Sequence, residues 1–144
     1  GQMGDVMQES ANIAYTFVRH VSEQHGVEQE YFEKNTIHLH IPAGATPKDG
    51  PSAGITMATA LLSLATGKTL KNNLAMTGEL SLTGSVLPIG GLKEKTIAAR
   101  RNGIRTIIIP SENEKDLKEI PEHIKKGIRF HLATTMNDVM KVLF

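Results

Sequence analysis

The sequence predicts a mixed α/β fold in a single domain that spans residues 1–144. Two observations support this fold class. Segments with helical periodicity alternate with short β-branched runs, above all in the second half of the chain. A length of 144 residues with 40% hydrophobic side chains also allows one domain with a buried interior. We therefore expect small mixed sheets with helices packed against them.

The first part of the chain predicts one long helix and one strand. Apolar residues recur at spacings of three and four over residues 5–25, and Gly26 follows as a stop signal, which indicates an amphipathic helix. Residues 36–41 alternate strictly between apolar and polar side chains, with Ile37, Leu39 and Ile41 on one face. This period of two predicts a half-buried strand.

Glycine and proline then mark a loop over residues 43–51, and a helix is expected over 52–66, closed by Gly67. A β-branched run over 104–109 is typical of a buried strand. Ser111 with Glu114 three residues on predicts a capping box. The elements expected after Gly67 are a strand over 74–77, a hairpin over 80–82 and 85–87, a helix over 92–101, a strand over 104–109, a short helix after Ser111, a strand over 128–132 and a helix over 135–144.

The composition argues against several classes of protein. The absence of cysteine excludes a disulfide framework, a thiol nucleophile and a thiolate metal site. Lys and Arg number 16 against 15 Asp and Glu, so we expect neither a nucleic-acid nor a membrane partner. The longest apolar run, over 55–65, is shorter than the roughly 20 residues that span a bilayer. The N-terminus has no signal-peptide pattern, and we expect an excised domain.

The stretch PKDGPSAG, residues 47–54, places Ser52 just ahead of a predicted helix. One interpretation is a helix cap, because serine is a preferred N-cap residue. The other is a nucleophile, since the first turn of a helix has free backbone N–H groups that can hold an oxyanion. Gly50 and Gly54 would let a substrate come close, and Ala53 adds little bulk beside the hydroxyl.

A serine nucleophile needs a base, and the sequence offers histidines and a lysine. His38 and His40 share one face of the predicted strand and could serve a Ser-His arrangement or a metal, although such a pair is more often a surface face. In the stretch LPIGGLKEK, Lys95 lies beside the apolar side of its helix, whereas Lys93 points toward solvent. A desolvated lysine can lose its proton and act as a general base.

The sequence resembles the proteolytic domain of the ATP-dependent Lon proteases of the bacterial A type. The resemblance rests on TPKDGPSAGITMATALLS and on MTGELSLTGSVLPIGGLKEKTIAARRNGI, and it continues from GDVMQESA at the start to IIIPSENEKDLKEIPEHI near the end. It therefore covers almost the whole chain. It implies the Lon protease-domain fold, which is similar to the second domain of ribosomal protein S5, and a serine endopeptidase that works through a Ser-Lys dyad.

The resemblance also implies roles for individual residues. Ser52 corresponds to the nucleophile and Lys95 to the base, while Thr77 would orient the lysine. Asp49 is considered for its position three residues before Ser52, where it could be an exposed loop carboxylate or a gate. As a gate, it would pair with Lys95 and keep the ammonium charged when folded over the site, and it would release the amine when swung away. Backbone N–H groups at Ser52, at Ala53 and in the loop before Pro51, at Gly50, are the candidate oxyanion donors. Glu79, His38 and His40 are candidates to line the site or subunit contacts.

The resemblance also implies partners outside these residues. The full-length proteins are homohexamers of the bacterial cytoplasm whose upstream AAA+ module uses ATP and magnesium to feed unfolded or degron-bearing proteins to the peptidase. We expect the AAA+ ATPase and N-terminal domains to lie outside this chain, and the chain itself to need no cofactor and no metal. The stretch TGKT at 66–69 lacks the first glycine of a Walker A motif, because Leu62 stands in its place, so no nucleotide site is predicted.

Two alternatives remain open from the sequence. The chain could be a catalytically silent Lon-like binding or assembly module, since the fold alone does not determine function. It could also be a Ser-His hydrolase that uses His38 or His40. The complete motifs around both Ser52 and Lys95 favour the Ser-Lys peptidase over both alternatives.

Overall fold

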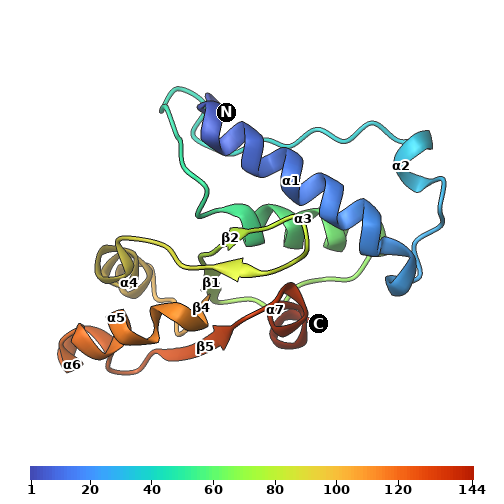
Figure 1. Cartoon of the computed structure of the whole chain (residues 1–144). Helices are drawn as coiled ribbons and strands as arrows, with labels where there is room; N and C mark the ends of the chain where they lie inside the picture. Colours follow the sequence, from blue (N-terminus) through green and yellow to red (C-terminus); the bar gives the residue numbers. More distant parts are fainter.

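The computed structural model describes all 144 residues, and helices alternate with short strands along it (Figure 1). The elements are α1 (Asp5–Val21), the 3-10 turn η1 (Ser22–His25), α2 (Tyr31–Lys34), α3 (Gly54–Thr66), β1 (Leu74–Met76), β2 (Glu79–Leu80), β3 (Val86–Leu87), α4 (Leu92–Arg101), β4 (Thr106–Pro110), the 3-10 turn η2 (Ser111–Asn113), α5 (Glu114–Glu119), α6 (Glu122–Lys125), β5 (Arg129–Ala133) and α7 (Met136–Leu143). The mixed α/β class predicted from the sequence is confirmed.

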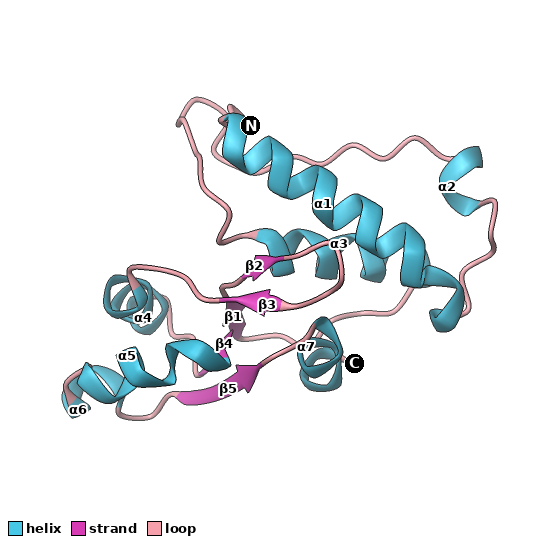
Figure 2. Cartoon of the chain, in the orientation of Figure 1, coloured by secondary structure: helices cyan, strands magenta, loops and turns pink.

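Two small sheets form the centre of the domain (Figure 2). One is parallel, with β4 between β1 and β5, and Ile108 of β4 lies opposite both Met76 and His131. The other is the hairpin β2–β3, in which Glu79 lies opposite Leu87. Parallel neighbours need crossover connections. Helix α4 supplies the connection from β1 to β4, and α5 and α6 supply the one from β4 to β5.

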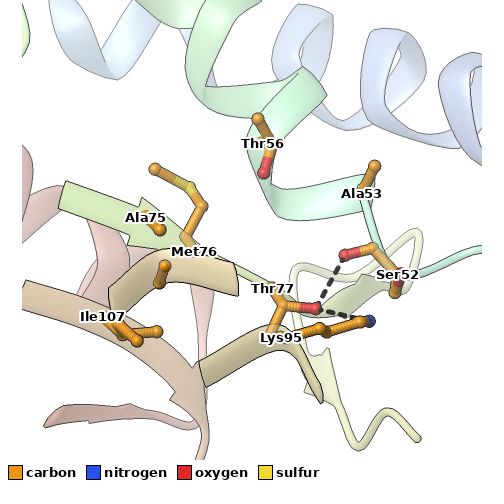
Figure 3. Close-up of a pocket in the computed structure, with 9 residues that line it drawn as sticks. Ser52, Ala53, Thr56, Ala75, Met76, Thr77, Lys95 and Ile107 are labelled. Atoms are coloured by element: carbon orange, nitrogen blue, oxygen red, sulfur yellow. Dashed lines mark hydrogen bonds between the residues drawn. The ribbon is translucent and has the colours of Figure 1, made fainter. Parts of the chain in front are cut away.

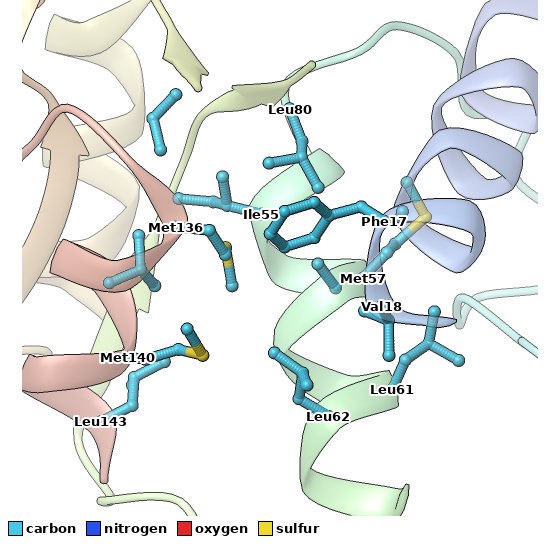
Figure 4. Packing of buried hydrophobic residues seen from close by; sticks show 14 of the residues in the cluster. Phe17, Val18, Ile55, Met57, Leu61, Leu62, Leu80, Met136, Met140 and Leu143 are labelled. Carbon is cyan, nitrogen blue, oxygen red and sulfur yellow. The ribbon is translucent and has the colours of Figure 1, made fainter. Parts of the chain in front are cut away.

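The central strand β4 separates two hydrophobic clusters. Its side chains alternate, so Ile108 joins the larger cluster, whereas Ile107 and Ile109 join the smaller one. The larger cluster brings together side chains of α1, α3 and α7 with the hairpin, including Phe17 and Ile55 (Figure 4). The smaller one packs α4 and the segment around α5 and α6 on the opposite face. The sheet is therefore covered by helices on both sides.

Most predicted elements are present with shifted ends. The long N-terminal helix is α-helical to Val21 and ends in a 3-10 turn before Gly26, whose φ of 80° fits a glycine stop. Gly67 closes α3 in the same way, with φ of 70°. The hairpin is present but shorter than predicted, because only two residues of each strand pair.

The predicted strand over 36–41 is wrong. The segment has no strand partner, and its backbone forms no hydrogen bonds of the sheet type. Its alternation still has a physical cause, because Ile37, Leu39 and Ile41 are half-buried against the larger cluster while His38 and His40 are exposed. The periodicity therefore indicates which side chains are buried, but it does not indicate whether a neighbouring strand is present.

The predicted capping box at Ser111 is also wrong. The Ser111 hydroxyl donates instead to the carbonyl of Ala133 at 3.0 Å, which ties η2 to the end of β5. A capping box is present at α7, where Thr135 and Asp138 cap each other's backbone groups. The backbone N–H groups of Thr134 and Thr135 lower the pKa of the Asp138 carboxyl.

Charge contributes little to the packing of the elements. The structure contains two ion pairs, Lys34 with Glu30 and Lys125 with Glu122, and each joins neighbours on one short helix or at its start.

None of the helices is both long enough and apolar enough to cross a membrane.

Gly54, the first residue of α3, is expected to be intolerant of a side chain. An alanine Cβ there would lie 2.8 Å from the backbone nitrogen of Leu80, which cannot move without disturbing β2. We expect Gly54→Ala to lower the free energy of unfolding by about 1 to 3 kcal/mol, despite the better helix propensity of alanine. Urea denaturation measures the change.

Gly90→Ala is the matched control for Gly54→Ala, because a Cβ at Gly90 meets no atom within 4 Å and its φ is not positive. An unfolding free energy of Gly54→Ala equal to that of Gly90→Ala would contradict the steric argument.

Candidate active site

Ser52 lies in a tight turn just ahead of α3, and not within the helix as predicted. The N–H of Gly54 donates to the carbonyl of Pro51 at 3.1 Å, so residues 51–54 form the turn and Ala53 takes the N-cap position. No side chain caps this helix. The cap interpretation of Ser52 is therefore wrong, and its hydroxyl makes no bond that a helix cap requires.

The backbone of Ser52 is anchored to the end of β1. Its carbonyl accepts hydrogen bonds from the N–H of Gly78 at 2.8 Å and from the hydroxyl of Thr77 at 3.4 Å. The N–H of Ile55 donates in turn to the carbonyl of Gly78 at 3.1 Å. These bonds fix the serine beside the carboxyl end of a parallel strand, the edge at which open α/β sheets bind ligands.

Lys95 reaches the same point from the first turn of α4. Its Nζ donates to the Thr77 hydroxyl oxygen at 3.1 Å, so one threonine contacts both Ser52 and Lys95 (Figure 3). The lysine side chain is half-buried, and this burial lowers the pKa of its amine. Lys93 is exposed, as the helical pattern predicts.

A cavity of about 200 Å³ opens beside these three side chains. It lies between the start of α3, the end of β1 and the inner face of α4 (Figure 3). The lining residues are Ser52, Ala53, Thr56, Ala75, Met76, Thr77, Lys95, Ala99 and Ile107. Most of the wall is apolar, while Ser52, Thr77 and Lys95 lie together on one side of it (Figure 3).

Two backbone N–H groups at the serine are free. Those of Ser52 and Ala53 donate to no group of the chain, and both residues line the cavity. The N–H of Gly50 donates to the Asp49 carboxylate at 2.8 Å, and Pro51 has no N–H. No hydrogen bond joins the Ser52 hydroxyl to the Lys95 amine directly, and Thr77 bridges the two residues.

Asp49 points away from the cavity, toward the start of α1. Its Oδ1 accepts the N–H of Met7 at 2.8 Å as well as that of Gly50. The Met7 N–H, followed by that of Gly50, lowers the pKa of the Asp49 carboxyl. The carboxylate forms no ion pair with Lys95 here, so in this conformation it satisfies a helix N-terminus.

The loop that carries Asp49 is held against the N-terminal segment. The Lys48 amine donates to three carbonyls, those of Gly1, Ala43 and Thr46, at 2.8, 2.6 and 2.8 Å. The N–H of Gly4 donates to the Lys48 carbonyl at 2.7 Å. The position of the loop before Ser52 therefore depends on residues at the N-terminal end of α1.

Three residues considered in the sequence lie outside this cavity. Glu79 lines a separate hollow on the other side of the turn, next to Ser10. His38 and His40 are exposed on the extended segment before the loop. No group of three His, Asp or Glu side chains is placed to hold a metal ion.

The whole chain, residues 1–144, matches the family described as the Lon protease (S16) C-terminal proteolytic domain. The chain belongs to this family. It is 62% identical over 144 residues to the Lon protease of Borrelia duttonii and 63% identical over 145 residues to that of Treponema pallidum. Against the Lon protease homolog, mitochondrial, of Drosophila melanogaster the identity is 56% over 144 residues.

All three alignments cover 100% of this chain but only 18%, 16% and 14% of the respective relatives. The chain thus spans less than a fifth of the length of these Lon proteases. The family assignment predicted from the sequence is confirmed, and its description as a proteolytic domain supports a peptidase function.

The apolar wall of the site is the part of this Lon domain that the sequence analysis missed. Met76 and Ile107 come from adjacent strands and Ala99 from α4, so only the fold brings them together. Ser10 of α1 was missed as well; it is buried, and its hydroxyl lies 3.5 Å from the Pro51 carbonyl. The small side chains on one face of α4 were the available signal for a cavity.

The contact between Asp49 and α1 depends on the small size of Gly4. A Cβ at Gly4 would collide with the Asp49 carboxyl group and lie 2.8 Å from its Cβ. We expect Gly4→Ala to expel the carboxylate from the Met7 N–H, so that the pKa of Asp49 rises toward its ordinary value. Side-chain carboxyl NMR over a pH series measures this shift.

Gly44→Ala serves as the control, since its Cβ would meet only His40, at an ordinary contact distance of 3.7 Å. If the titration of Asp49 is the same in both variants and in the unmodified chain, the N-terminal contact is not what holds the carboxylate.

Proposed function

We propose that this Lon domain is a serine endopeptidase in which Ser52 is the nucleophile and Lys95 the general base. The supporting observation is the arrangement of Ser52 and Lys95 around one threonine hydroxyl, beside a cavity with free backbone N–H groups. Burial of the Lys95 amine supports the same assignment, because a base must spend part of its time unprotonated.

In the acylation step, the Ser52 oxygen attacks the carbonyl carbon of the substrate peptide bond while its proton passes to the neutral Lys95 amine. The tetrahedral intermediate then collapses, the C–N bond breaks, and the lysine returns the proton to the leaving nitrogen. The shortened substrate is left as an ester on Ser52. Thr77 keeps the amine on the side of the cavity that faces the serine.

Deacylation repeats the sequence with water. Lys95 takes a proton from the water as its oxygen bonds to the ester carbon, and the proton passes to the Ser52 oxygen when the ester bond breaks. In both steps negative charge develops on the former carbonyl oxygen. The unengaged N–H groups of Ser52 and Ala53 are the donors we assign to it. The Gly50 N–H becomes a third donor only when Asp49 leaves it.

Asp49 fits a gating role in this scheme. In the present conformation its charge is held at α1, so it does not stabilise the Lys95 ammonium. If the loop turned the carboxylate toward the lysine, the ion pair would raise the pKa of the amine and suppress the base. The contact with Met7 thus corresponds to the released state of the gate.

For the full-length protein we propose ATP-dependent proteolysis of unfolded, damaged or degron-bearing proteins in a cytoplasmic homohexamer. The name Lon protease of the relatives supports proteolysis, and their much greater length leaves room for an ATPase module. ATP and magnesium would bind in the AAA+ module outside these 144 residues. This chain itself is proposed to bind neither nucleotide nor nucleic acid.

Substitution of either dyad residue is the direct test. We expect Ser52→Ala and Lys95→Ala each to lower kcat/KM for a fluorogenic peptide by at least about 100-fold. This figure is the lower end of the rate acceleration that a general base typically contributes. A peptide boronate should label Ser52 in the unmodified chain and fail after Lys95→Ala. Activity should rise with pH through the lowered pKa of Lys95, because only the neutral amine is a base.

His38→Ala and His40→Ala are the matched controls, and they should retain activity because both side chains lie outside the cavity. Full activity of Lys95→Ala with loss in a histidine variant would instead support a Ser-His hydrolase. No boronate labelling and no hydrolysis in the unmodified chain, with the fold intact, would support a silent binding module.

Two substitutions of Asp49 separate its contacts. Asp49→Asn keeps an oxygen for the Met7 N–H but cannot form an ion pair with Lys95, whereas Asp49→Ala loses both. If the gate operates, Asp49→Asn raises peptidase activity and shifts the rising limb of the pH profile to lower pH. A profile and activity identical to the unmodified chain would remove the gate.

A further inference from the structure

Asn113, at the end of η2, is buried, with 2% of its surface exposed, and its side chain is fully engaged. Its Oδ1 accepts the N–H of Ile89 at 2.9 Å, and its Nδ2 donates to the carbonyl of the same Ile89 at 2.9 Å. Nδ2 also donates to Asp116 at 2.7 Å. One amide group therefore holds both backbone groups of a residue 24 positions earlier in the chain.

Ile89 stands just before the start of α4. Gly91, with φ of 72°, takes the N-cap position, and no side chain caps the helix. The first hydrogen bond of the helix is donated by the N–H of Lys95 itself, to the Gly91 carbonyl at 3.1 Å. Lys95 thus lies in the first turn, the part of a helix that frays most readily.

Gly90 and Gly91 are exposed and have no side chains that could pack. Glycine also gives the chain between Ile89 and Leu92 the greatest conformational freedom. On the helix side of this joint, Leu92 is buried in the smaller cluster, and its carbonyl accepts the hydroxyl of the buried Thr96 at 2.7 Å. On the other side, the half-buried Ile89 side chain packs against the same cluster, and the Asn113 amide is what holds the Ile89 backbone.

We propose that Asn113 is a positioning residue for Lys95, because its amide clamps both backbone groups of Ile89 and so fixes the start of α4 where Nζ reaches the Thr77 hydroxyl. The expected effect of Asn113 on catalysis rests on the proposed Ser-Lys function. Its effect on the position of the first turn of α4 does not depend on that function.

The test compares Asn113→Ala with Asn113→Ser in the full chain. Alanine removes all three hydrogen bonds, whereas serine keeps one short neutral polar group that cannot bind both backbone groups of Ile89 at once. Native-state hydrogen exchange reports the geometry: we expect the Lys95 amide to exchange about tenfold faster or more, as loss of one to two net hydrogen bonds implies. Serine covers the case in which the alanine variant does not fold.

Val139→Ala is the control for a general loss of stability, since Val139 is fully buried in α7 on the opposite face of the sheet. If the clamp operates, the Asn113 variants should show faster hydrogen exchange of the Lys95 amide relative to the amides of β4, and a lower kcat at unchanged KM. Val139→Ala should show neither effect after its kcat is corrected for the fraction of folded protein.

The outcomes separate the two proposals. Lys95 exchange in the folded Asn113 variants equal to that in Val139→Ala would overturn the clamp. Faster exchange at Lys95, combined with full activity of Lys95→Ala, would uphold the clamp and overturn the Ser-Lys mechanism. Faster exchange with unchanged kcat, while Lys95→Ala is inactive, would overturn the positioning role.

Discussion

The hydrogen bonds to the Ser52 carbonyl are the interaction on which the site depends. The Gly78 N–H and the Thr77 hydroxyl both bind this oxygen, and the same Thr77 hydroxyl accepts the Lys95 amine. Turn, strand and helix therefore meet at one threonine. Gly78 also lets β3 and α3 pack closely beside this point, because a Cβ there would lie 2.8 Å from the Val86 side chain and 3.0 Å from that of Ile55.

The proposed nucleophile and the proposed base belong to different halves of the core. Ser52 precedes α3, which packs in the larger cluster, whereas α4 carries Lys95 and packs in the smaller one. The strand β4 lies between them and contributes side chains to both. Each cluster can hold its own element rigidly, while the distance between serine and lysine depends on how the two layers meet across β1 and β4.

Much of this arrangement could be predicted from the sequence, and the errors have common causes. Helix α4 and the β-branched strand β4 were predicted closely because periodicity and local stop signals determine them. The strand over 36–41 was wrong because pairing is a tertiary property that a single segment does not encode. Ser52 and Lys95 stood out as local motifs, and the role of Thr77 came from the resemblance. The contacts of Asp49 with α1 and of Asn113 with Ile89 link distant segments and left no local signal.

The scarcity of ion pairs determines how this domain responds to salt. Both pairs are short-range and lie on surface helices, so raising the ionic strength screens interactions that contribute little to stability. The lowered pKa of Lys95 arises from burial, and not from a neighbouring charge that mobile ions could mask. The fold and the reactivity of its lysine should therefore persist together across a wide range of ionic strength.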